Sequence, residues 1–276
     1  MTYLEFDFKV SPLPIGSEIL IAELGEVGFE SFVENDSGFL AYIPEQDFVE
    51  NVFKEIQLLK NPDFTITWDA KTIEQQNWNS EWEKNFHPIK IDNQCMVRAP
   101  FHEKEEVQYD IIIEPKMSFG TGHHETTHMM LQHILNYDFE DKSVLDMGCG
   151  TGILAILAEM RGAKPIEAID IDNWCYLNSI ENVERNNCVN IKVFEGDSNL
   201  LDGKRFDIII ANINRNILLD DIPKYSRCLS KEGLLFLSGF YESDLKTISS
   251  KCDEYSLEYA HNLEKNNWVA AVYRKR

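Results

Sequence analysis

The pattern of apolar and polar positions in the first 73 residues differs from the pattern from residue 143 onward. In the first part the pattern predicts strands and helices in the order Thr2–Val10 (strand), Ser17–Gly28 (helix), Phe29–Glu34 and Gly38–Ile43 (strands), Gln46–Leu59 (helix) and Phe64–Ile73 (strand). Ser17 is expected to cap the first helix. This order predicts a smaller ferredoxin-like α+β domain.

From residue 143 onward, short apolar runs alternate with amphipathic segments. Predicted strands lie at Ser143–Met147, Pro165–Ile171, Asn190–Glu195, Phe206–Ile213 and Gly233–Gly239, and predicted helices at Gly152–Arg161, Trp174–Asn186, Ile217–Cys228 and Ser243–Lys251. Two further strands, Ser256–Leu263 and Asn267–Tyr273, have no helix between them and should pair as an antiparallel hairpin. The pattern predicts an α/β, Rossmann-like domain with a seven-stranded, mostly parallel sheet covered by helices on both faces.

The segment between these two parts is distinguished by regularly spaced aromatic residues. Trp78, Trp82 and Phe86 recur every four residues, which predicts a short helix with one aromatic stripe that packs between domains. Two more strands, at about Pro88–Pro100 and Val107–Glu114, should follow. The expected organisation is a first domain over residues 1–73, a linker over 74–100 and a second domain over 101–276.

The composition indicates a protein of the reducing cytoplasm. No apolar run approaches the ~20 residues needed to span a bilayer, and the N-terminus carries acids where a secretory signal would be basic and apolar. The six cysteines form no C-x-x-C pair and no metal-like spacing, so free thiols are expected. Nothing in the sequence demands more than a monomer.

The chain is strongly acidic, with a formal net charge of −21. Residues 1–70 hold 14 Asp and Glu against three Lys. Such a surface repels phosphates, which argues against nucleic acid as a direct substrate, and it would attract a basic partner. Acidity that merely aids solubility explains the composition equally well.

The sequence Asp146-Met-Gly148-Cys-Gly150-Thr-Gly152 follows a predicted strand and opens a helix. Glycines at such a turn let the backbone approach a ligand, and the helix N-terminus offers free N–H groups. The spacing G-x-G-x-G differs from the G-x-G-x-x-G of dinucleotide sites. Asp146 suits a ligand with an ammonium and a sulfonium better than a pyrophosphate. A tight turn without a ligand is the alternative.

Polar residues also end the strands that follow the glycine turn. Asp170 sits where doubly wound sheets meet ribose hydroxyls, and Asp172 is expected to cap the next helix. Asp197 would either accept a hydrogen bond from an adenine amino group or cap a loop. Asn212, at the end of the fourth strand, could accept hydrogen bonds from a nucleophilic amine.

The stretch Phe119–His128 contains H-E-x-x-H at His124 and His128, which by itself indicates a zinc peptidase. No third zinc ligand stands out, and the Gly-Thr-Gly that precedes the motif matches no metzincin extension. A flexible glycine turn that leads into a helix, with Thr121 and Thr127 lining a cofactor pocket, is the preferred interpretation. We therefore expect no metal.

Together these motifs resemble the bacterial ribosomal protein L11 methyltransferase family (PrmA). The stretch Phe119–Thr127 looks like that family's segment ahead of the glycine loop, and Asp146–Gly152, Asp170 and Asn212 match its cofactor-binding pattern in order and spacing. The aromatic linker and the acidic first domain match as well, so the resemblance covers the whole chain.

The resemblance implies a class I methyltransferase that uses S-adenosyl-L-methionine, with Thr127, Gly148, Asp170 and Asn212 in contact with the cofactor. The substrate would be L11, a small basic ribosomal protein, methylated on its N-terminal α-amine and on lysine ε-amines. The first domain would recognise it. The sequence Asn212-Ile-Asn214-Arg215 departs from the Asn-Pro-Pro-Tyr pattern of many amine methyltransferases, so their clamp on a planar nitrogen is not transferred.

An amine must lose a proton before it can accept a methyl group, and lysine has a pKa of ~10.4 against ~7.7–8.0 for an α-amine. No dedicated base is evident in the sequence, so positioning by Asn212 is the expected catalytic contribution. A methyltransferase of the same fold acting on another protein, a small molecule or RNA is the alternative function.

Overall fold

The computed structural model describes residues 2–73, 86–116 and 118–276. The chain divides into two compact units, Met1–Lys84 and Asn85–Arg276. Trp78 and Trp82, which the sequence places on an aromatic helix, lie outside the described residues.

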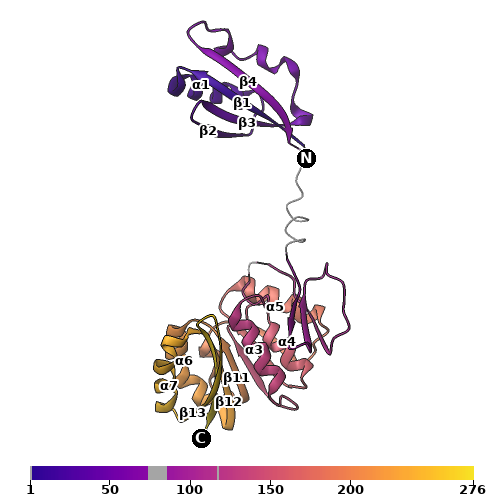
Figure 1. The fold of residues 1–276 in the computed structure, drawn as a ribbon, viewed down its shortest axis with the longest axis vertical. Coiled ribbons are helices and arrows are strands. Elements are labelled where there is room, and N and C mark those ends of the chain that lie inside the picture. The colour runs from indigo at the N-terminus through magenta and orange to yellow at the C-terminus, as the bar shows by residue number, and fades with distance from the viewer. Residues whose placement is uncertain (1, 74–85, 117) are drawn as a thin grey trace. The chain divides into compact units, whose positions relative to one another are not determined.

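The first unit is an antiparallel sheet with one helix on its apolar face. Its elements are β1 (Tyr3–Ser11), α1 (Leu13–Glu26), β2 (Ser31–Asn35), β3 (Gly38–Pro44) and β4 (Thr65–Ile73). The strand order β2-β3-β1-β4 is that of the predicted ferredoxin-like topology (Figure 1). Alternate residues of β1, Phe6, Phe8 and Val10, pack with Leu20 and Leu24 of α1 in the core.

The predicted helix Gln46–Leu59 is wrong. Three short 3₁₀ helices replace it: η1 (Glu45–Asp47), η2 (Glu50–Lys54) and η3 (Leu58–Lys60). The rings of Phe48 and Phe53 lie 5.2 and 5.4 Å from the ring of Phe6. Packing both rings around Phe6 fixes the path of the chain, so tertiary contacts override the helical spacing of the sequence.

The expected cap at Ser17 is also wrong. Helix α1 begins at Leu13, one turn earlier, with Pro14 in its first turn, where a missing backbone N–H costs nothing. Ser17 is therefore inside the helix, and its buried hydroxyl meets no hydrogen-bond partner among the described residues.

The second unit is built on a large twisted sheet. Its elements are α3 (Glu125–Asn136), β8 (Val144–Met147), α4 (Ile153–Met160), β9 (Ile166–Asp170), α5 (Asn173–Arg185), β10 (Ile191–Glu195), η4 (Ser198–Leu201), β11 (Phe206–Asn212), α6 (Arg215–Cys228), β12 (Leu229–Tyr241), α7 (Glu242–Glu254), β13 (Leu257–Lys265) and β14 (Trp268–Lys275). The strand order is β10-β9-β8-β11-β12-β14-β13, parallel from β10 to β12.

Helices cover both faces of this sheet, as the sequence predicts. Helices α3, α4 and α5 pack on one face, and α6 and α7 on the other (Figure 1). Strands β13 and β14 form the predicted antiparallel hairpin, and its turn residues Asn266 and Asn267 have φ angles of 51° and 66°. Positive φ at both positions is the geometry of a tight hairpin turn.

A small three-stranded sheet precedes the large one and consists of β5 (Ile89–Ile91), β6 (Cys95–Arg98) and β7 (Tyr109–Ile112). A single strand over Pro88–Pro100 is thus a wrong prediction. Asp92 and Asn93 adopt φ angles of 47° and 55°, a left-handed turn that short polar side chains tolerate. None of the helices in the described ranges is both long and apolar enough to cross a bilayer.

The order of the large sheet creates a switch point between β8 and β11. From β8 the chain moves outward through β9 to β10, then returns to β11 on the other side of β8. In doubly wound sheets the carboxyl ends of such strands diverge and leave a crevice for a ligand. The glycine turn after β8 and Asn212 at the end of β11 lie side by side there, since Met147 pairs with Ala211.

Candidate functional site

A cavity of about 300 Å³ opens at the carboxyl ends of β8, β9 and β11. Five of the seven residues predicted to bind a cofactor line it: Gly148, Gly150, Asp170, Asp197 and Asn212. Phe119 and Ile213, which also line it, belong to stretches that the sequence singled out but were not themselves predicted to bind a cofactor. Asp221 lines it as well and has no local sequence signal.

The glycines of the turn are required by close contacts. Gly148 and Gly150 have φ angles of 71° and 56°. A Cβ at Gly148 would lie 2.1 Å from Cγ2 of Ile213, and one at Gly150 would lie 2.2 Å from the carbonyl oxygen of Phe119. The loop therefore packs against two other segments at distances that only glycine permits.

Asp170 holds the glycine turn in place. Its Oδ2 accepts a hydrogen bond of 2.8 Å from the N–H of Gly150, and its Oδ1 accepts one of 3.0 Å from the N–H of Asp172. Each carboxylate oxygen retains a second lone pair, so Asp170 can still accept from a hydroxyl group in the cavity. Asp172 occupies the predicted N-cap position of α5, but within the described part of the chain its side chain makes no capping bond.

Asp146 is fully buried and does not line the cavity. Its Oδ2 accepts a 3.1 Å hydrogen bond from the N–H of Ala155, while its Oδ1 meets no donor among the residues that the structure describes. Burial raises the pKa of Asp146 to about 7; the Ala155 N–H opposes this rise, and the charge of Asp170 adds to it. Burial thus favours the protonated form of this carboxyl more than that of a free Asp.

Asn212 lines the cavity, whereas Thr127, which the sequence also placed there, does not line it and contacts Asn212 from α3. The Asn212 amide nitrogen lies 3.5 Å from the hydroxyl oxygen of Thr127, a long hydrogen bond, and Thr127 is 1% exposed on α3. The side-chain carbonyl oxygen of Asn212, Oδ1, is buried, and no donor within the described ranges reaches it. A buried acceptor without a donor costs stability, so it marks Asn212 as a group set to receive an N–H.

Asp197 combines the two roles that the sequence left open. It lines the cavity, and its side chain accepts a 2.9 Å hydrogen bond from the N–H of Asn199 as the cap of η4. Thr121 lies elsewhere: its hydroxyl is 3.1 Å from Nδ1 of His123, and it lines a second hollow of about 490 Å³. Phe119 lines both the cavity and this second hollow.

The Phe119–Thr127 segment is joined to the glycine loop through Thr151. The Thr151 N–H donates to the carbonyl of Phe119 at 2.9 Å, and its hydroxyl donates to the carbonyl of Gly120 at 2.6 Å. Because these bonds cross between the loop and the segment, a shift of one moves the other.

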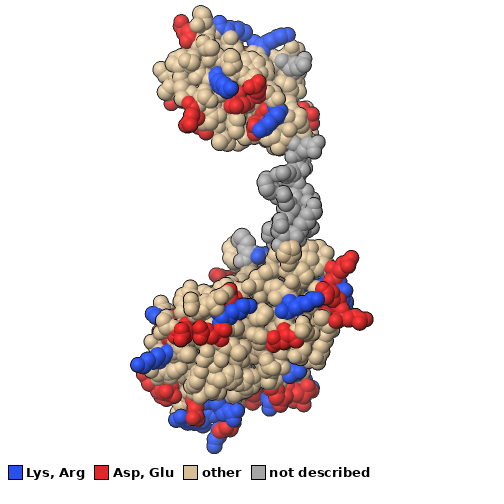
Figure 2. Space-filling view, viewed as in Figure 1, with Lys and Arg blue, Asp and Glu red and all other residues tan. Residues whose placement is uncertain are grey.

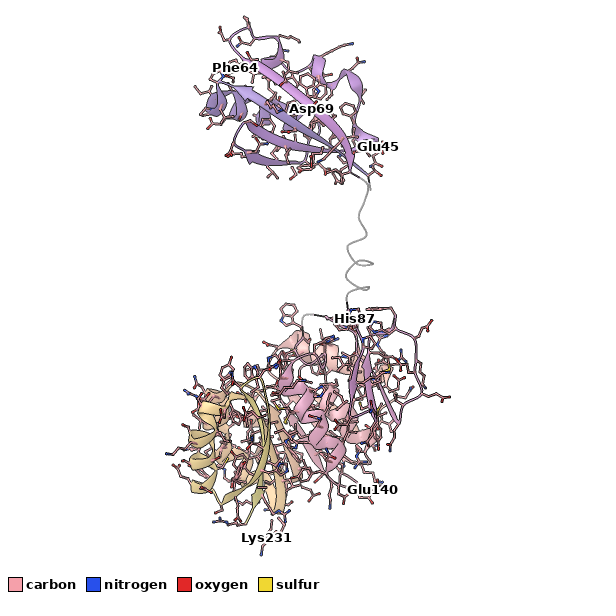
Figure 3. The ribbon with its side chains drawn as sticks, viewed as in Figure 1. Glu45, Phe64, Asp69, His87, Glu140 and Lys231 are labelled. Carbon is pink, nitrogen blue, oxygen red and sulfur yellow. The ribbon has the colours of Figure 1, made fainter. Side chains whose placement is uncertain are left out.

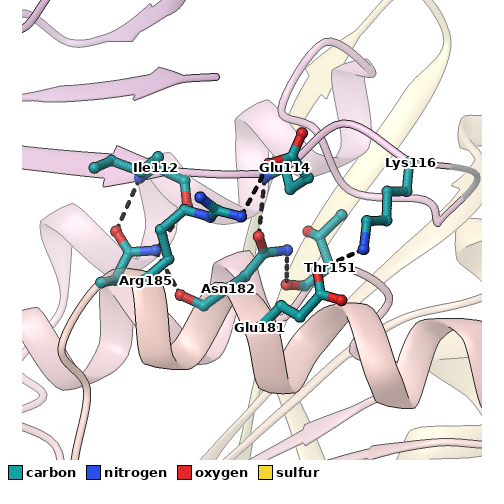
Figure 4. A network of polar contacts seen from close by, with 8 residues as sticks. Ile112, Glu114, Lys116, Thr151, Glu181, Asn182 and Arg185 are labelled. Atoms are coloured by element: carbon teal, nitrogen blue, oxygen red, sulfur yellow. Dashed lines mark hydrogen bonds and ion pairs between the residues drawn. The ribbon is translucent and has the colours of Figure 1, made fainter. Parts of the chain in front are cut away.

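Two asparagines of α5 hold the chain that leads into this segment (Figure 4). Asn182 donates to the Thr151 carbonyl at 3.0 Å and accepts from the Glu114 N–H at 2.9 Å. Asn186 accepts from the Ile112 N–H at 2.8 Å and donates to the Ile112 carbonyl at 2.7 Å. Sequence reasoning missed both; their i, i+4 spacing on one helix face was the only available signal.

The H-E-x-x-H motif does not assemble as a zinc site. His124 is the N-cap of α3, and its Nδ1 accepts a hydrogen bond from the Thr126 N–H, so this nitrogen is occupied. In the described residues, the one group of three or more potential ligand atoms within 4.8 Å of one another comprises Asp170, Asp172 and Cys175. Neither histidine belongs to it, which removes the basis of the peptidase alternative.

Comparisons with known proteins agree on one family. Residues 19–276 match the family model "Ribosomal protein L11 methyltransferase (PrmA)". A ribosomal protein L11 methyltransferase of Bacteroides thetaiotaomicron is 49% identical, covering 99% of both chains, and one of Porphyromonas gingivalis is 43% identical, covering 98% of this chain and 97% of the other.

Solved structures show the same fold. A ribosomal protein L11 methylase from Lactobacillus delbrueckii subsp. bulgaricus aligns with a TM-score of 0.65 and 28% identity, over 69% of this chain and all of the other. A methyltransferase from Pyrococcus furiosus aligns with a TM-score of 0.51 and 17% identity, over 60% of this chain and 89% of the other, a likeness of fold alone.

Proposed function

The chain belongs to the ribosomal protein L11 methyltransferase family, and on that premise we propose that it transfers methyl groups from S-adenosylmethionine to the N-terminal α-amine and the lysine ε-amines of L11. The single observation that carries the chemistry concerns Asn212: the residue lines the cavity, and its buried side-chain carbonyl oxygen is without a donor in the described part of the chain.

The residues at the cavity fit S-adenosylmethionine, which supplies an electrophilic methyl carbon on a sulfonium. Gly148 and Gly150 line the cavity in a turn that packs closely on Ile213 and Phe119. Asp170 and Asp197 offer carboxylate oxygens to ribose hydroxyls and an adenine amino group. The cavity volume falls at the lower end of the range of small-ligand pockets, ~300–1,000 Å³. Thr127 would act by orienting the amide of Asn212.

The reactive nitrogen must present a lone pair to the methyl carbon. We assign this orientation to Asn212, whose carbonyl oxygen accepts one N–H of the acceptor amine while its amide nitrogen is held by Thr127. A hydrogen bond from the amine to a fixed acceptor limits its rotation, and such positioning can supply a large part of a rate enhancement.

We assign substrate recognition to residues 1–73, the link between the parts to residues 74–100 and methyl transfer to residues 101–276. The support is electrostatic: residues 1–70 carry 14 acids against three lysines, which attracts a basic protein. On the face shown in Figure 2, lysines stand among the acids, so the attraction there is a long-range property of the unit and not of one patch.

We also propose that the enzyme acts in the cytoplasm, as a monomer and without direct contact with nucleic acid. The support is that all six cysteines carry free thiols and that the net charge of −21 repels a phosphate backbone.

The test is transfer of labelled methyl groups from S-adenosylmethionine to purified L11 by the full chain. Exchanging Asn212→Ala should weaken cofactor binding and lower turnover by about 100-fold, the cost of a misplaced reacting group. Unchanged kinetics in this variant would contradict the role of Asn212. Labelling of a small molecule or of RNA in place of L11 would favour the alternative substrate classes.

A further inference from the structure

Four of the 26 basic residues of the chain line one small cavity in the second unit. The cavity has a volume of about 240 Å³ and is bordered by η4, the turn after it and the second half of α6. We call it the basic pocket. Its charged lining residues, within the described part of the chain, are Lys204, Arg205, Lys224 and Arg227 against one acid, Asp202. Since the chain as a whole carries a formal net charge of −21, this gathering of cations is a local reversal of charge.

Two separate segments supply the cations of the basic pocket. Lys204 and Arg205 stand directly before β11, and Lys224 and Arg227 lie on α6. The two α6 residues are three positions apart, a spacing that places side chains on the same face of a helix. Lys224 also reaches η4, where its Nζ donates to Oδ1 of Asn199 at 3.2 Å. The fold, and not a run of basic residues in the sequence, therefore creates the cluster.

Two of the four cations are free to bind a ligand. Arg205 and Arg227 are exposed, and neither guanidinium has a hydrogen-bond or ion-pair partner among the residues that the structure describes. Lys204, by contrast, is paired with Glu167 at 2.5 Å. Each guanidinium offers five N–H donors in a planar fork, which fits the oxygen atoms of phosphate. An anion between them would relieve the repulsion of the like charges.

The size and charge of the basic pocket favour a phosphoryl group over other anions. Its volume lies below the ~300–1,000 Å³ of pockets that hold drug-sized molecules, so a small group fits it. A carboxylate brings one negative charge, whereas a phosphoryl group brings about −1.5 to −2 at neutral pH and three strong acceptor oxygens. Several converging cations therefore match phosphate better than a carboxylate.

Ser198 connects the basic pocket to the cofactor cavity. Its hydroxyl is buried, donates to Oδ1 of Asp221 at 2.5 Å and accepts from Nζ of Lys224 at 2.6 Å. The same Lys224 nitrogen lies 3.6 Å from Oδ1 of Asp221. Ser198 and Lys224 line the basic pocket, and Asp221 lines the cofactor cavity. A short chain of polar contacts thus joins the two cavities.

We propose that the basic pocket binds a phosphate anion and that this binding increases the affinity of the chain for S-adenosylmethionine. Bound phosphate competes with Asp221 for the Lys224 ammonium. The Asp221 carboxylate is then less neutralised, and the more negative cofactor cavity favours a cationic sulfonium. The inference rests on the proposed function only for the identity of the cofactor, and it requires no acceptor protein.

Two measurements on the full chain test the inference. Equilibrium dialysis with radiolabelled inorganic phosphate measures anion binding, and calorimetry measures S-adenosylmethionine affinity with and without saturating phosphate. Sodium chloride holds the ionic strength constant, because screening alone changes the interactions of charges. Phosphate should increase cofactor affinity by about 5-fold, the lower end of couplings between two sites, and the cofactor should increase phosphate affinity by the same factor. S-adenosylhomocysteine, which lacks the sulfonium charge, should respond less.

Variants separate the anion site from its coupling to the cofactor. Exchanging Arg205→Gln together with Arg227→Gln changes two exposed side chains and should weaken phosphate binding by about 10-fold or more, the effect of losing charge-assisted hydrogen bonds. Asp221→Asn keeps an acceptor for the Ser198 hydroxyl but removes the charge. Phosphate should then no longer change the cofactor affinity of this variant, whatever its starting value.

The matched control is the double exchange Lys231→Gln and Arg274→Gln. Both residues are exposed and line another hollow, of about 390 Å³, in which three acids balance three cations. This control should leave phosphate binding and its effect on cofactor affinity unchanged. A second probe, glycerol 2-phosphate, distinguishes the source of the phosphoryl group. Comparable binding of both probes would support a phosphomonoester as the ligand, and binding of inorganic phosphate alone would support the free anion.

A wild-type chain that binds no phosphate would overturn the inference, and so would binding that survives the double exchange of Arg205 and Arg227. Phosphate binding without any change in cofactor affinity would overturn the coupling through Asp221. The proposed function fails separately: a chain that shows both effects but transfers no methyl group to L11 keeps the basic pocket and loses the assigned substrate. A chain that methylates L11 and binds no phosphate keeps its function and loses the basic pocket.

Discussion

Selected polar side chains at the two edges of the large sheet differ in how completely they are hydrogen-bonded. At the carboxyl edge, the buried Oδ1 atoms of Asp146 and Asn212 meet no donors in the described ranges. At the amino edge, the N–H and the hydroxyl of Ser143 donate to Oδ2 of Asp207 at 3.0 and 2.8 Å, and the Asp207 N–H donates back to the Ser143 hydroxyl oxygen at 3.0 Å.

The contrast extends to the protonation of the carboxyl groups. Burial raises the pKa of Asp146 to about 7. Burial also acts to raise the pKa of Asp207, but the hydrogen bonds from Ser143 and the charge of Lys142 outweigh it and hold the pKa below its ordinary value. The charged form of an Asp is thus disfavoured at the carboxyl edge, in Asp146, and favoured at the amino edge, in Asp207.

Within the second unit, the polar groups at the amino edge of the sheet contribute to stability, and those at the carboxyl edge serve the candidate site. Figure 3 shows Glu140 and Lys231 at one end of the second unit and His87 at the other. The His87 carbonyl oxygen lies 3.0 Å from Nε2 of His123, a residue that lines the second hollow. Buried polar groups without hydrogen-bond partners at a functional edge cost stability, and hydrogen-bonded pairs elsewhere offset this cost. Substitutions at the two edges should therefore have different consequences.

The largest effect is expected at the glycine turn of the carboxyl edge. In Gly150→Ala the new Cβ would lie 2.2 Å from the Phe119 carbonyl oxygen, so the turn or the Phe119–Thr127 segment must move. A displacement of about 1 Å in a binding site can cost about 100-fold. We expect a loss of this size in S-adenosylmethionine affinity, measured by calorimetry.

The matched control is Gly203→Ala. Gly203 also has a positive φ, 76°, but beyond its two neighbours in the chain no heavy atom of the described residues lies within 4 Å of an added Cβ. Both variants carry the left-handed strain of about 1 kcal/mol, and only Gly150→Ala adds the collision. Equal cofactor affinities in the two variants would show that the close contact at the carboxyl edge is not needed for binding.

Sequence patterns predicted the large sheet well because its strands and helices are periodic over their whole lengths, from β8 to β14. They failed over Gln46–Leu59, where the path of the chain depends on rings that pack around Phe6, and no local pattern contains that information. The second unit offered stronger local signals than the first, namely glycine turns and acids at strand ends.

The candidate site likewise contains residues that local sequence patterns predicted and contacts that they did not. Gly148, Gly150 and Asp170 were found from the sequence because a turn and a strand end are local features. The contact between Ile112 and Asn186 spans 74 positions, and the ring contact of His124 with Trp268 spans most of the second unit. Such partners come together only through the topology of the sheet, so spacing in the sequence cannot reveal them.

A smaller effect, on stability alone, is expected at the amino edge. Asp207→Ala removes the acceptor of both Ser143 donors and should cost about 2 kcal/mol of unfolding free energy, with cofactor affinity unchanged. Because the pKa of Asp207 is lowered, its contribution is present above the unfolded pKa of ~3.9 and is lost as the pH falls through the folded value. Denaturant unfolding at pH 7 measures the loss.

The control for this exchange is Asp202→Ala, an exposed acid that follows η4, which should stay within about 0.5 kcal/mol of the wild type. If Asp207→Ala weakened cofactor binding as strongly as it lowered stability, the two edges would be coupled, and the division between them would not hold.

The smallest effect is a gain of stability at the carboxyl edge. The unfolded chain releases the proton of Asp146 near pH 4, whereas the folded chain holds it up to about pH 7. The free energy of unfolding therefore falls as the pH rises between these two values. Asp146→Asn removes this fall. Since the amide still buries a polar atom, we expect only about 1 kcal/mol of gain at pH 8 and less at pH 5.

Thermal unfolding of the cofactor-free wild type and of Asp146→Asn, followed from pH 5 to 8, measures this difference. The advantage of the variant should grow as the pH rises, whereas its S-adenosylmethionine affinity should decrease, because the amide keeps an acceptor for the Ala155 N–H but lacks the negative charge that favours a cationic sulfonium. Parallel pH curves for the two proteins would contradict the raised pKa. A variant that gained stability and kept full affinity would show that the open carboxyl at this edge serves no function, and the contrast between the edges would then depend on Asn212 alone.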